Sequence, residues 1–283
     1  MSKDNLSIKN QKISNWQKEL LNLVNTQKYK EALDYCQNAK EDYSKDSVTL
    51  TIKGFAHSNL KEYTEALKCY SEALSIDISN SSAWYNLGVT YTQMPGENEE
   101  KALHCYDKVL EISPNRLDAL YNKSIILLYS TNTKKGNFKY NEAIHSFNLI
   151  LKALPHPEYS YIKEEDIWFY KGNCYKKLEE YSKAIECYNI ALKINPNFLG
   201  ARAKKLNVLY TMELTEVFKM NEKSERGLES NSNFRELAEN NVDEEKTFTI
   251  EHLKILNSLS TENKEAVMEI IKKAKEKENV LNA

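Results

Sequence analysis

Glycine and proline are scarce in this sequence, with seven and five residues respectively in a chain of 283. Sheet-rich proteins use both residues freely in their turns, and loops that bind phosphate need glycine. The low content of both residues therefore argues against these two classes of protein. It predicts a chain that is almost entirely helical.

An excess of positive charge and a long apolar run are also missing. The chain has 39 Lys and Arg against 41 Asp and Glu, a net charge of −2, whereas binding to nucleic acid or anionic lipid regardless of sequence needs clustered basic residues. The longest apolar run, Ile125 to Tyr129, is far shorter than the roughly 20 residues that span a bilayer. These features argue against a membrane protein and against a nucleic-acid partner.

The N-terminal residues MSKDNLSIKNQK are polar and lack the apolar stretch of a secretory signal. The five cysteines are scattered, and no two of them form a CxxC pair. In a chain without an export signal, such cysteines are expected to be reduced and to pack as small apolar residues. The sequence therefore predicts a cytoplasmic protein.

An internal repeat is the main feature that is present. Its clearest unit is residues 167–197, and the rarest residues of the chain recur at fixed positions of this unit. They are the three tryptophans (Trp16, Trp84, Trp168), three of the glycines (Gly54, Gly88, Gly172) and three of the prolines (Pro114, Pro155, Pro196).

The spacing within a unit predicts two helices. A large residue, a glycine and an aromatic residue share one face of the first helix, and an alanine, an aromatic residue and a small apolar residue share one face of the second. Neither helix can bury its apolar face alone, so neighbouring units must stack. We expect the aromatic residue at the tryptophan position, such as Trp168, to be buried between the two helices of its unit.

This pattern resembles the tetratricopeptide repeat family over about residues 13–198, in five units. The resemblance implies an all-α fold, a right-handed α-α superhelical solenoid of about five helix pairs, followed by a capping helix and a C-terminal helical tail. Two units depart from the pattern, because Leu20 and Ser124 stand where the glycine belongs.

Composition divides the chain into four segments. Residues 1–12 form a polar extension, and residues 13–220 contain the repeats and the capping helix. Residues 221–247 have few apolar residues and carry eight acidic against four basic side chains, which is typical of a flexible linker. Residues 248–283 regain helical periodicity, and their apolar stripe is expected either to dock on the repeats of the same chain or to bind a partner.

Catalytic chemistry has little support in this sequence. It lacks GxGxxG, GxxxxGK[ST], HExxH and GxSxG motifs, and its five histidines are far apart. Cys69, Cys105 and Cys187 share one repeat position, where packing is a better explanation than metal ligation. We therefore predict no enzyme activity, no cofactor and no metal site.

The resemblance implies that the first helices line an inner face that binds a peptide or protein. The positions that map to this face are Thr51, Phe55, Tyr85, Asn86, Val89, Tyr121, Asn122, Ile125, Phe169, Tyr170, Asn173, Lys204 and Asn207. The dipeptide Tyr-Asn recurs at the same place of two neighbouring units, and asparagine recurs at a second place. Because an amide offers both a donor and an acceptor, a row of asparagines is suited to the backbone of an extended peptide.

The sequence thus predicts a non-enzymatic adapter or scaffold that binds a protein or peptide partner in a groove. Two alternatives remain: a helical-repeat RNA-binding protein, and an accessory subunit of an enzyme complex. One variant of the family binds the C-terminal carboxylate of chaperones with a set of lysine, asparagine and arginine side chains on its inner face. No three consecutive units of this sequence contain that set, so we do not expect this protein to bind chaperones in that way.

Overall fold

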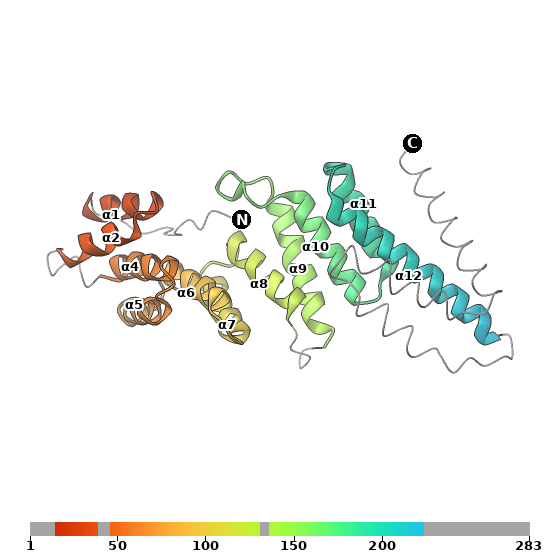
Figure 1. Ribbon diagram of the computed structural model, residues 1–283, viewed down its shortest axis with the longest axis horizontal. Helices are drawn as coiled ribbons and strands as arrows, with labels where there is room; N and C mark the ends of the chain where they lie inside the picture. The colour runs from red at the N-terminus through yellow and green to blue at the C-terminus, as the bar shows by residue number, and fades with distance from the viewer. Residues whose placement is uncertain (1–14, 39–45, 131–135, 224–283) are drawn as a thin grey trace. The chain divides into compact units, whose positions relative to one another are not determined.

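The computed structural model describes residues 15–38, 46–130 and 136–223. Within these ranges every regular element is a helix, and no strand occurs (Figure 1). The all-α fold predicted from the scarcity of glycine and proline is therefore confirmed.

The helices follow one another as pairs. Each pair consists of a first helix of 11 to 14 residues and a second helix of 9 to 16 residues. The pairs are α1 (Asn15–Asn25) with α2 (Tyr29–Gln37), α4 (Ser47–Asn59) with α5 (Tyr63–Ile76), α6 (Ser81–Gln93) with α7 (Glu99–Ile112), α8 (Leu117–Tyr129) with α9 (Phe138–Ala153), and α10 (Glu164–Lys177) with α11 (Tyr181–Ile194). A 3-10 turn, η2 (Pro157–Tyr159), precedes α10, and α12 (Leu199–Lys223) follows the last pair.

Short turns between paired helices use the left-handed backbone region. Gln27, Lys61 and Glu179 have φ values of 62°, 62° and 59°, each at the connection between the first and second helix of its pair. A residue in this conformation ends a helix by reversing the chain direction. The third and fourth pairs have longer connections, at residues 94–98 and 130–137.

Side-chain caps start two of the first helices. The Asp46 carboxylate accepts hydrogen bonds from the backbone N–H groups of Val48 and Thr49, and the Asn80 side chain accepts one from Ala83. These bonds satisfy donors that have no partner within the helix. The starts of α4 and α6 are thereby set by a local sequence signal.

The chain divides into two compact units, residues 1–174 and residues 175–283. The first unit contains α1 to α9, η2 and most of α10, and the second contains the end of α10 together with α11 and α12. In the second unit α11 packs against α12, so a helix follows the last pair where the sequence predicts a cap. The predicted linker from residue 224 onward and the predicted helical segment 248–283 lie outside the described residues.

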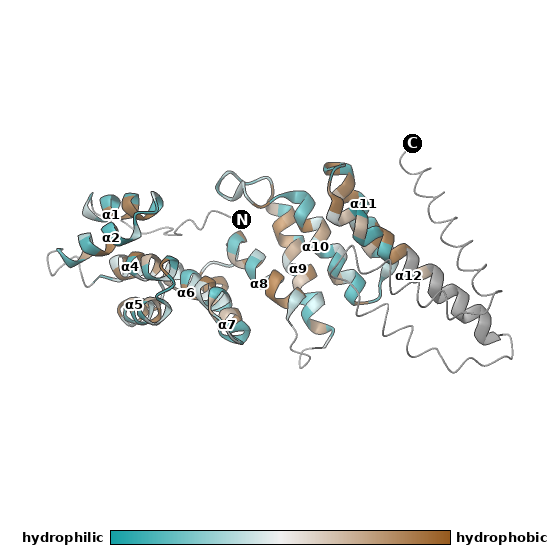
Figure 2. Ribbon diagram, in the orientation of Figure 1, coloured by the Kyte–Doolittle hydropathy of each residue, from teal (hydrophilic) through white to brown (hydrophobic). Residues whose placement is uncertain are grey.

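The cores form where the small and aromatic positions of the repeat meet. Both hydrophobic and hydrophilic residues occur on the helices, as the stripes in Figure 2 show. The tyrosine of the second helix is fully buried in three pairs, at Tyr70, Tyr106 and Tyr188. The matching alanines, Ala66, Ala102 and Ala184, are also fully buried.

The tryptophan position differs from the prediction. Trp168 is half-buried, whereas its neighbour Ile167 is fully buried. The indole N–H of Trp168 donates to the Glu164 carboxylate at 3.2 Å, and the Lys171 ammonium lies 4.5 Å from the ring centroid. The expectation of a buried Trp168 is therefore corrected, because the ring lies partly across the surface of its own helix.

Candidate functional site

The predicted groove positions all lie on the first helices of pairs two to five or on α12. In the first unit they come from α4, α6, α8 and α10, and in the second unit from α12. The structure thus places these residues on helices, as the sequence predicts. Whether each side chain is accessible is a separate matter, and the positions differ in this respect.

Two of the predicted positions on α4 belong to the interior. Thr51 is fully buried; its hydroxyl donates to the Ser47 carbonyl at 2.7 Å and accepts from the Asn80 amide at 3.1 Å. Phe55 is 6% exposed and packs edge-to-face against Tyr29 with ring centroids 6.3 Å apart. Neither side chain is presented to a ligand, and both serve the packing of the second pair on its neighbours.

The predicted asparagine row is also partly interior. Asn86 is 3% exposed and Asn173 is 8% exposed. The amide nitrogen of Asn86 has no hydrogen-bond acceptor among the described residues. The expectation that Asn86 projects away from the helix-pair core is therefore corrected, since its side chain is enclosed by its surroundings.

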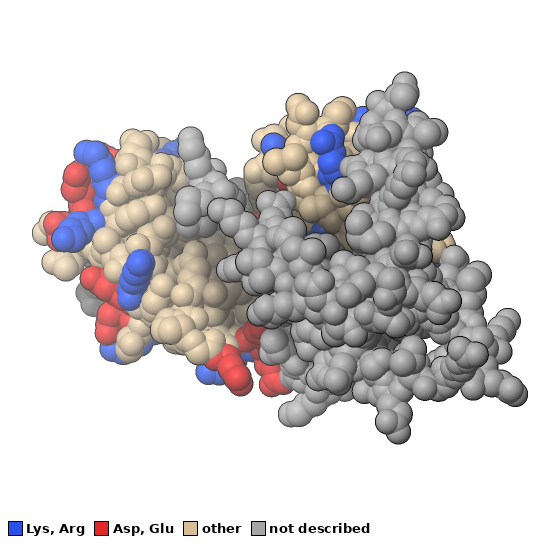
Figure 3. All heavy atoms as spheres, turned by 45° about the vertical axis from the view of Figure 1, so that its right-hand side comes forward, with Lys and Arg blue, Asp and Glu red and all other residues tan. Residues whose placement is uncertain are grey.

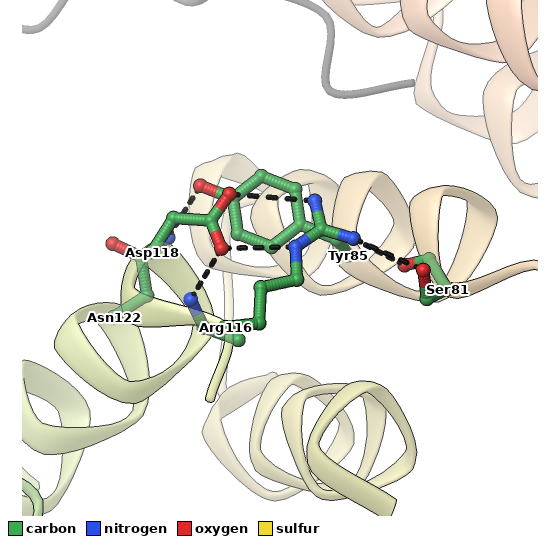
Figure 4. Close-up of polar contacts among 6 residues, drawn as sticks. Ser81, Tyr85, Arg116, Asp118 and Asn122 are labelled. Atoms are coloured by element: carbon green, nitrogen blue, oxygen red, sulfur yellow. Dashed lines mark hydrogen bonds and ion pairs between the residues drawn. The ribbon is translucent and has the colours of Figure 1, made fainter. Parts of the chain in front are cut away.

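A polar cluster links α6 to α8 and contains two of the predicted positions (Figure 4). The Asn122 amide donates to the Tyr85 hydroxyl at 3.1 Å. The Arg116 guanidinium lies over the Tyr85 ring, 4.5 Å from its centroid. The Tyr-Asn positions of neighbouring units therefore contact each other directly.

A buried ion pair fixes this cluster. Arg116 Nε donates to Asp118 Oδ1 at 2.9 Å, and Arg116 Nη1 donates to the Ser81 carbonyl at 3.1 Å. Both side chains of the pair are almost completely buried, at 3% and 5% exposed. Burial, and then the charge of Asp118, raise the pKa of Tyr85 well above its ordinary value. Tyr85 thus acts as a neutral hydroxyl at physiological pH.

Sequence reasoning missed Arg116, Asp118 and Ser81. Arg116 directly precedes α8, and Asp118 lies in its first turn, where a carboxylate is favoured. An arginine two residues before an acidic residue at a helix start is a weak signal by itself. Its role depends on Tyr85 and Ser81, which are more than 30 residues away in the chain.

A second cluster joins α8 to α10 and consists of aromatic rings. Tyr170 contacts Tyr121 with centroids 6.1 Å apart and Tyr129 with centroids 6.5 Å apart, both edge-to-face. Tyr170 also stacks on Phe147 of α9 at 6.2 Å and contacts Phe169 at 5.4 Å. Tyr121 and Tyr170 are half-buried, and Tyr129 is 58% exposed. The sequence named Tyr121, Phe169 and Tyr170 for the groove but missed Tyr129.

The remaining predicted groove positions in the first unit, Val89 and Ile125, are half-buried.

In the second unit Asn207 accepts a hydrogen bond from the Lys176 ammonium at 2.6 Å. Burial, followed by the charges of Lys204 and Lys177, lowers the pKa of Lys176 to about 8. Lys204 and Asn207 therefore form part of a basic environment in that unit.

Possible metal ligands and cysteine side chains occur in the described part of the chain. Within it, no group of three or more His, Cys, Asp or Glu side chains is placed to hold a metal ion. Burial raises the pKa of Cys36 and of Cys105 to about 12 and that of Cys69 to about 11. These thiols are protonated and buried, in agreement with the packing role predicted for Cys69 and Cys105. Among the described helices, none has both the length and the apolar character needed to cross a membrane.

The stacked helix pairs define an α-solenoid repeat protein. Residues 59–94 match a family model described as TPR repeat, and residues 81–116 and 165–198 match two models described as tetratricopeptide repeat. These residues are therefore tetratricopeptide repeats, in agreement with the resemblance seen in the sequence pattern.

Comparisons with individual proteins agree with this assignment. One similar solved structure is the crystal structure of YrrB, described as a TPR protein with an unusual peptide-binding site. Its superposition on this chain has a TM-score of 0.54, and the two sequences are 20% identical. The match covers 67% of this chain and 90% of the YrrB chain. This likeness shows the fold alone.

Curated relatives match over shorter stretches. Photosystem I assembly protein Ycf3 of Acaryochloris marina is 36% identical over 89 residues, 30% of this chain and 52% of that protein. Anaphase-promoting complex subunit 3 of Schizosaccharomyces pombe is 31% identical over 65 residues, 23% of this chain and 10% of that protein. The chain thus spans about half the length of the first of these relatives and a tenth of the second.

Proposed function

We propose that this protein is a non-enzymatic adapter that binds an extended segment of a partner protein along the inner face of the first unit. The face used is formed by α6, α8 and α10. Its accessible groups are the half-buried side chains Tyr85, Asn122, Tyr121, Ile125 and Tyr170.

One observation carries this proposal: the tyrosine side chains of three consecutive first helices (Tyr85, Tyr121, Tyr170), together with Asn122, are not fully buried in the core. Tyrosine offers a large, stiff contact area at low entropic cost, and the amide offers a donor and an acceptor to a peptide backbone. Such a surface suits recognition of a chain in extended form. The buried positions Thr51, Phe55, Asn86 and Asn173 are not included in the proposed contact set.

The names of the relatives support a role within assemblies. One is a photosystem I assembly protein and another is a subunit of the anaphase-promoting complex. For this chain we propose the same general kind of role, in which the repeats hold a partner rather than transform it.

The distribution of charge favours a protein partner over RNA. On the face shown in Figure 3, the described Lys and Arg side chains lie interspersed with Asp and Glu, without a continuous basic patch. The basic groups of α8 are engaged internally: Arg116 pairs with Asp118, and Lys123 pairs with Asp107 and Glu142 at 2.7 and 2.6 Å. Phosphate binding needs accessible lysine and arginine in the groove.

The test begins by selecting peptides that bind the full chain from a displayed library of random linear dodecapeptides. The affinity of each selected peptide is then measured by fluorescence anisotropy. Asn122→Ala removes one hydrogen-bonding group and should weaken binding roughly two- to twelve-fold, the effect of about 0.5–1.5 kcal/mol. Asn189→Ala is the matched control, because Asn189 is an exposed asparagine on the second helix α11.

Tyr85→Phe separates two causes of an Asn122 effect. It removes the internal partner of Asn122 while keeping the amide available to a ligand. Weakening by Asn122→Ala but not by Tyr85→Phe would assign the amide to the peptide. Equal binding by wild type, Asn122→Ala and Asn189→Ala would contradict the proposed face.

A further inference from the structure

Helix α12 carries apolar residues on two opposite faces. Ala201 and Val208 are fully buried on one face, and α12 packs against α11. Leu199, Ala203 and Leu206 follow one another at spacings of four and three residues, so they share a second face on the other side of the helix. Leu199 is 68% exposed, and Ala203 and Leu206 are half-buried. A helix that ends a repeat array needs a polar outer face, and these three positions do not provide one.

The repeat register identifies what packs on this second face in the other pairs. Leu206 occupies the glycine position of the repeat, one unit after Gly172. At this position in the second and third pairs, an added Cβ atom would lie 2.8 Å from Tyr70 of α5 and 3.0 Å from Tyr106 of α7. The position therefore faces the second helix of its own pair. Among the described residues no helix follows α12, so the place of its second helix is not filled by any of them.

Residue sizes at the two facing positions are complementary. Gly54 faces the large ring of Tyr70. In the first pair the glycine position holds Leu20 and the tyrosine position holds the small Cys36, and both residues are buried in one apolar cluster. Close packing requires that a larger residue on one side is matched by a smaller one on the other. A second helix that packs on Leu206 should therefore carry a residue smaller than tyrosine at the facing position.

Residues 262–278 meet this requirement by their sequence. Their apolar residues recur at helical spacing and form one stripe: Ala266, Val267, Ile270, Ile271 and Ala274. The second helices have an alanine followed four positions later by a tyrosine, as in Ala66 and Tyr70. In residues 262–278 the alanine is Ala266, and the large residue four positions later is the aliphatic Ile270.

The length of the intervening chain allows this segment to reach α12. Residues 224–261, on the order of 40 residues, connect the end of α12 to residue 262, and a chain of this length has a root-mean-square span on the order of 30 Å. Leu206 lies about 26 Å from the end of α12 along the helix axis, at a rise of about 1.5 Å per residue. The connection is therefore long enough for residues 262–278 to lie beside Leu206.

We propose that residues 262–278 pack on the face of α12 that carries Leu199, Ala203 and Leu206, as the second helix of a sixth pair within the same chain. This packing removes both apolar stripes from water. The side of residues 262–278 opposite their stripe carries Glu265, Lys272 and Lys275, which supplies the polar outer face that ends a repeat array. The inference concerns the end of the array and is independent of the peptide-binding face proposed for the first unit.

Hydrogen exchange of the full chain, measured by mass spectrometry, tests this packing. In the wild-type protein residues 262–278 should exchange slowly. Ile270→Asp should accelerate exchange roughly ten-fold or more, both in residues 262–278 and in residues 199–212 of α12, because burial protects both only while they are packed together. Helices α4 to α7 should exchange as in wild type, which checks that the variant is folded.

Met268→Asp is the matched control for Ile270→Asp. It adds the same charge to the same segment, on the side opposite the apolar stripe, and should leave exchange in α12 unchanged. Two results would overturn the proposal: fast exchange of residues 262–278 in the wild-type protein, or acceleration by Ile270→Asp that is confined to residues 262–278.

A fluorescent peptide of residues 262–278 gives an independent measurement by anisotropy. It should bind the full chain carrying Ile270→Asp, in which the face of α12 is vacant. It should bind wild type roughly ten-fold or more weakly, because the tethered segment competes at an effective concentration on the order of millimolar. Adding Leu206→Asp to the Ile270→Asp chain should abolish binding. Equal binding to wild type and to Ile270→Asp, or binding to neither, would contradict the proposal.

Sedimentation velocity distinguishes packing within one chain from packing between two. Wild type and Ile270→Asp should both sediment as monomers. A wild-type dimer that Ile270→Asp converts to a monomer would show that residues 262–278 pack on a second copy, and packing within the chain would then be wrong.

Discussion

Gly54 of α4 lies directly against the ring of Tyr70 of α5. A Cβ atom added at Gly54 would lie 2.8 Å from Tyr70 Cε1 and 3.0 Å from Cδ1 and Cζ. Tyr70 is fully buried, so its ring is enclosed by neighbouring groups. The same relationship recurs between Gly88 and Tyr106, where the closest distance is 3.0 Å.

Gly54→Ala should therefore destabilise the protein even though alanine is the better helix former. The gain in helix propensity is about 1 kcal/mol, whereas overpacking of a core typically costs about 1–3 kcal/mol. We expect a net loss in the free energy of unfolding measured in urea. Ser71→Ala on the exposed face of α5 is the control and should leave the midpoint unchanged. A midpoint for Gly54→Ala at or above the wild-type value would show that the Tyr70 ring moves freely.

Removing one partner of the buried ion pair should be strongly destabilising. Asp118→Ala leaves the Arg116 guanidinium buried without its carboxylate, a change that costs about 3–5 kcal/mol in buried pairs. Urea denaturation followed by circular dichroism measures the loss. The control is Glu65→Ala, which breaks an exposed pair with Lys68 and should shift the midpoint little. Equal effects of the two substitutions would argue that the Arg116–Asp118 pair is hydrated in solution.

Helix α10 offers a direct comparison of two adjacent large residues. Ile167 is fully buried and Trp168 is half-buried. Ile167→Ala should cost about 2–5 kcal/mol, the range for deleting a buried aliphatic side chain. Trp168→Ala should cost less, although it removes the larger side chain. Thermal or urea unfolding of both variants checks this order, and the reverse order would restore the sequence-based expectation of a buried tryptophan.

Stability should fall at alkaline pH because of the buried thiols. The pKa of Cys36 and of Cys105 is raised to about 12 in the folded state, and that of Cys69 to about 11, whereas an exposed thiol titrates near 8.5. Above pH 9 the unfolded chain releases these protons while the folded chain retains them. The free energy of unfolding then decreases by about 1.4 kcal/mol per pH unit for each thiol, until the pH approaches the folded pKa.

Cys105→Ala provides the measurement for this pH dependence. The alanine variant should lose less stability than wild type between pH 8 and pH 11, since one of the titrating groups is absent. Urea midpoints determined at several pH values give the two slopes. Parallel slopes for wild type and variant would contradict the assignment of this pH dependence to Cys105.

The sequence by itself determined the helices and their pairing. The recurrence of glycine, aromatic residues and alanine at fixed spacing predicted five helix pairs and a terminal helix, which the structure contains. It also placed the candidate groove residues, such as Tyr85 and Asn122, on the first helices of their pairs. These features follow from local periodicity, because the spacing of side chains along a helix fixes the face on which each one lies.

Tertiary structure decided which of those side chains are accessible and what they contact. Asn86 and Asn122 occupy the same repeat position, yet Asn86 is 3% exposed and Asn122 is half-buried and bonded to Tyr85. The Arg116–Asp118 pair could not be predicted, since it depends on Ser81 and Tyr85 in the preceding pair. Periodicity specifies the direction of a side chain from its own helix. Its burial and its partners depend on the residues that neighbouring helices bring against it, and these are set only when the pairs stack.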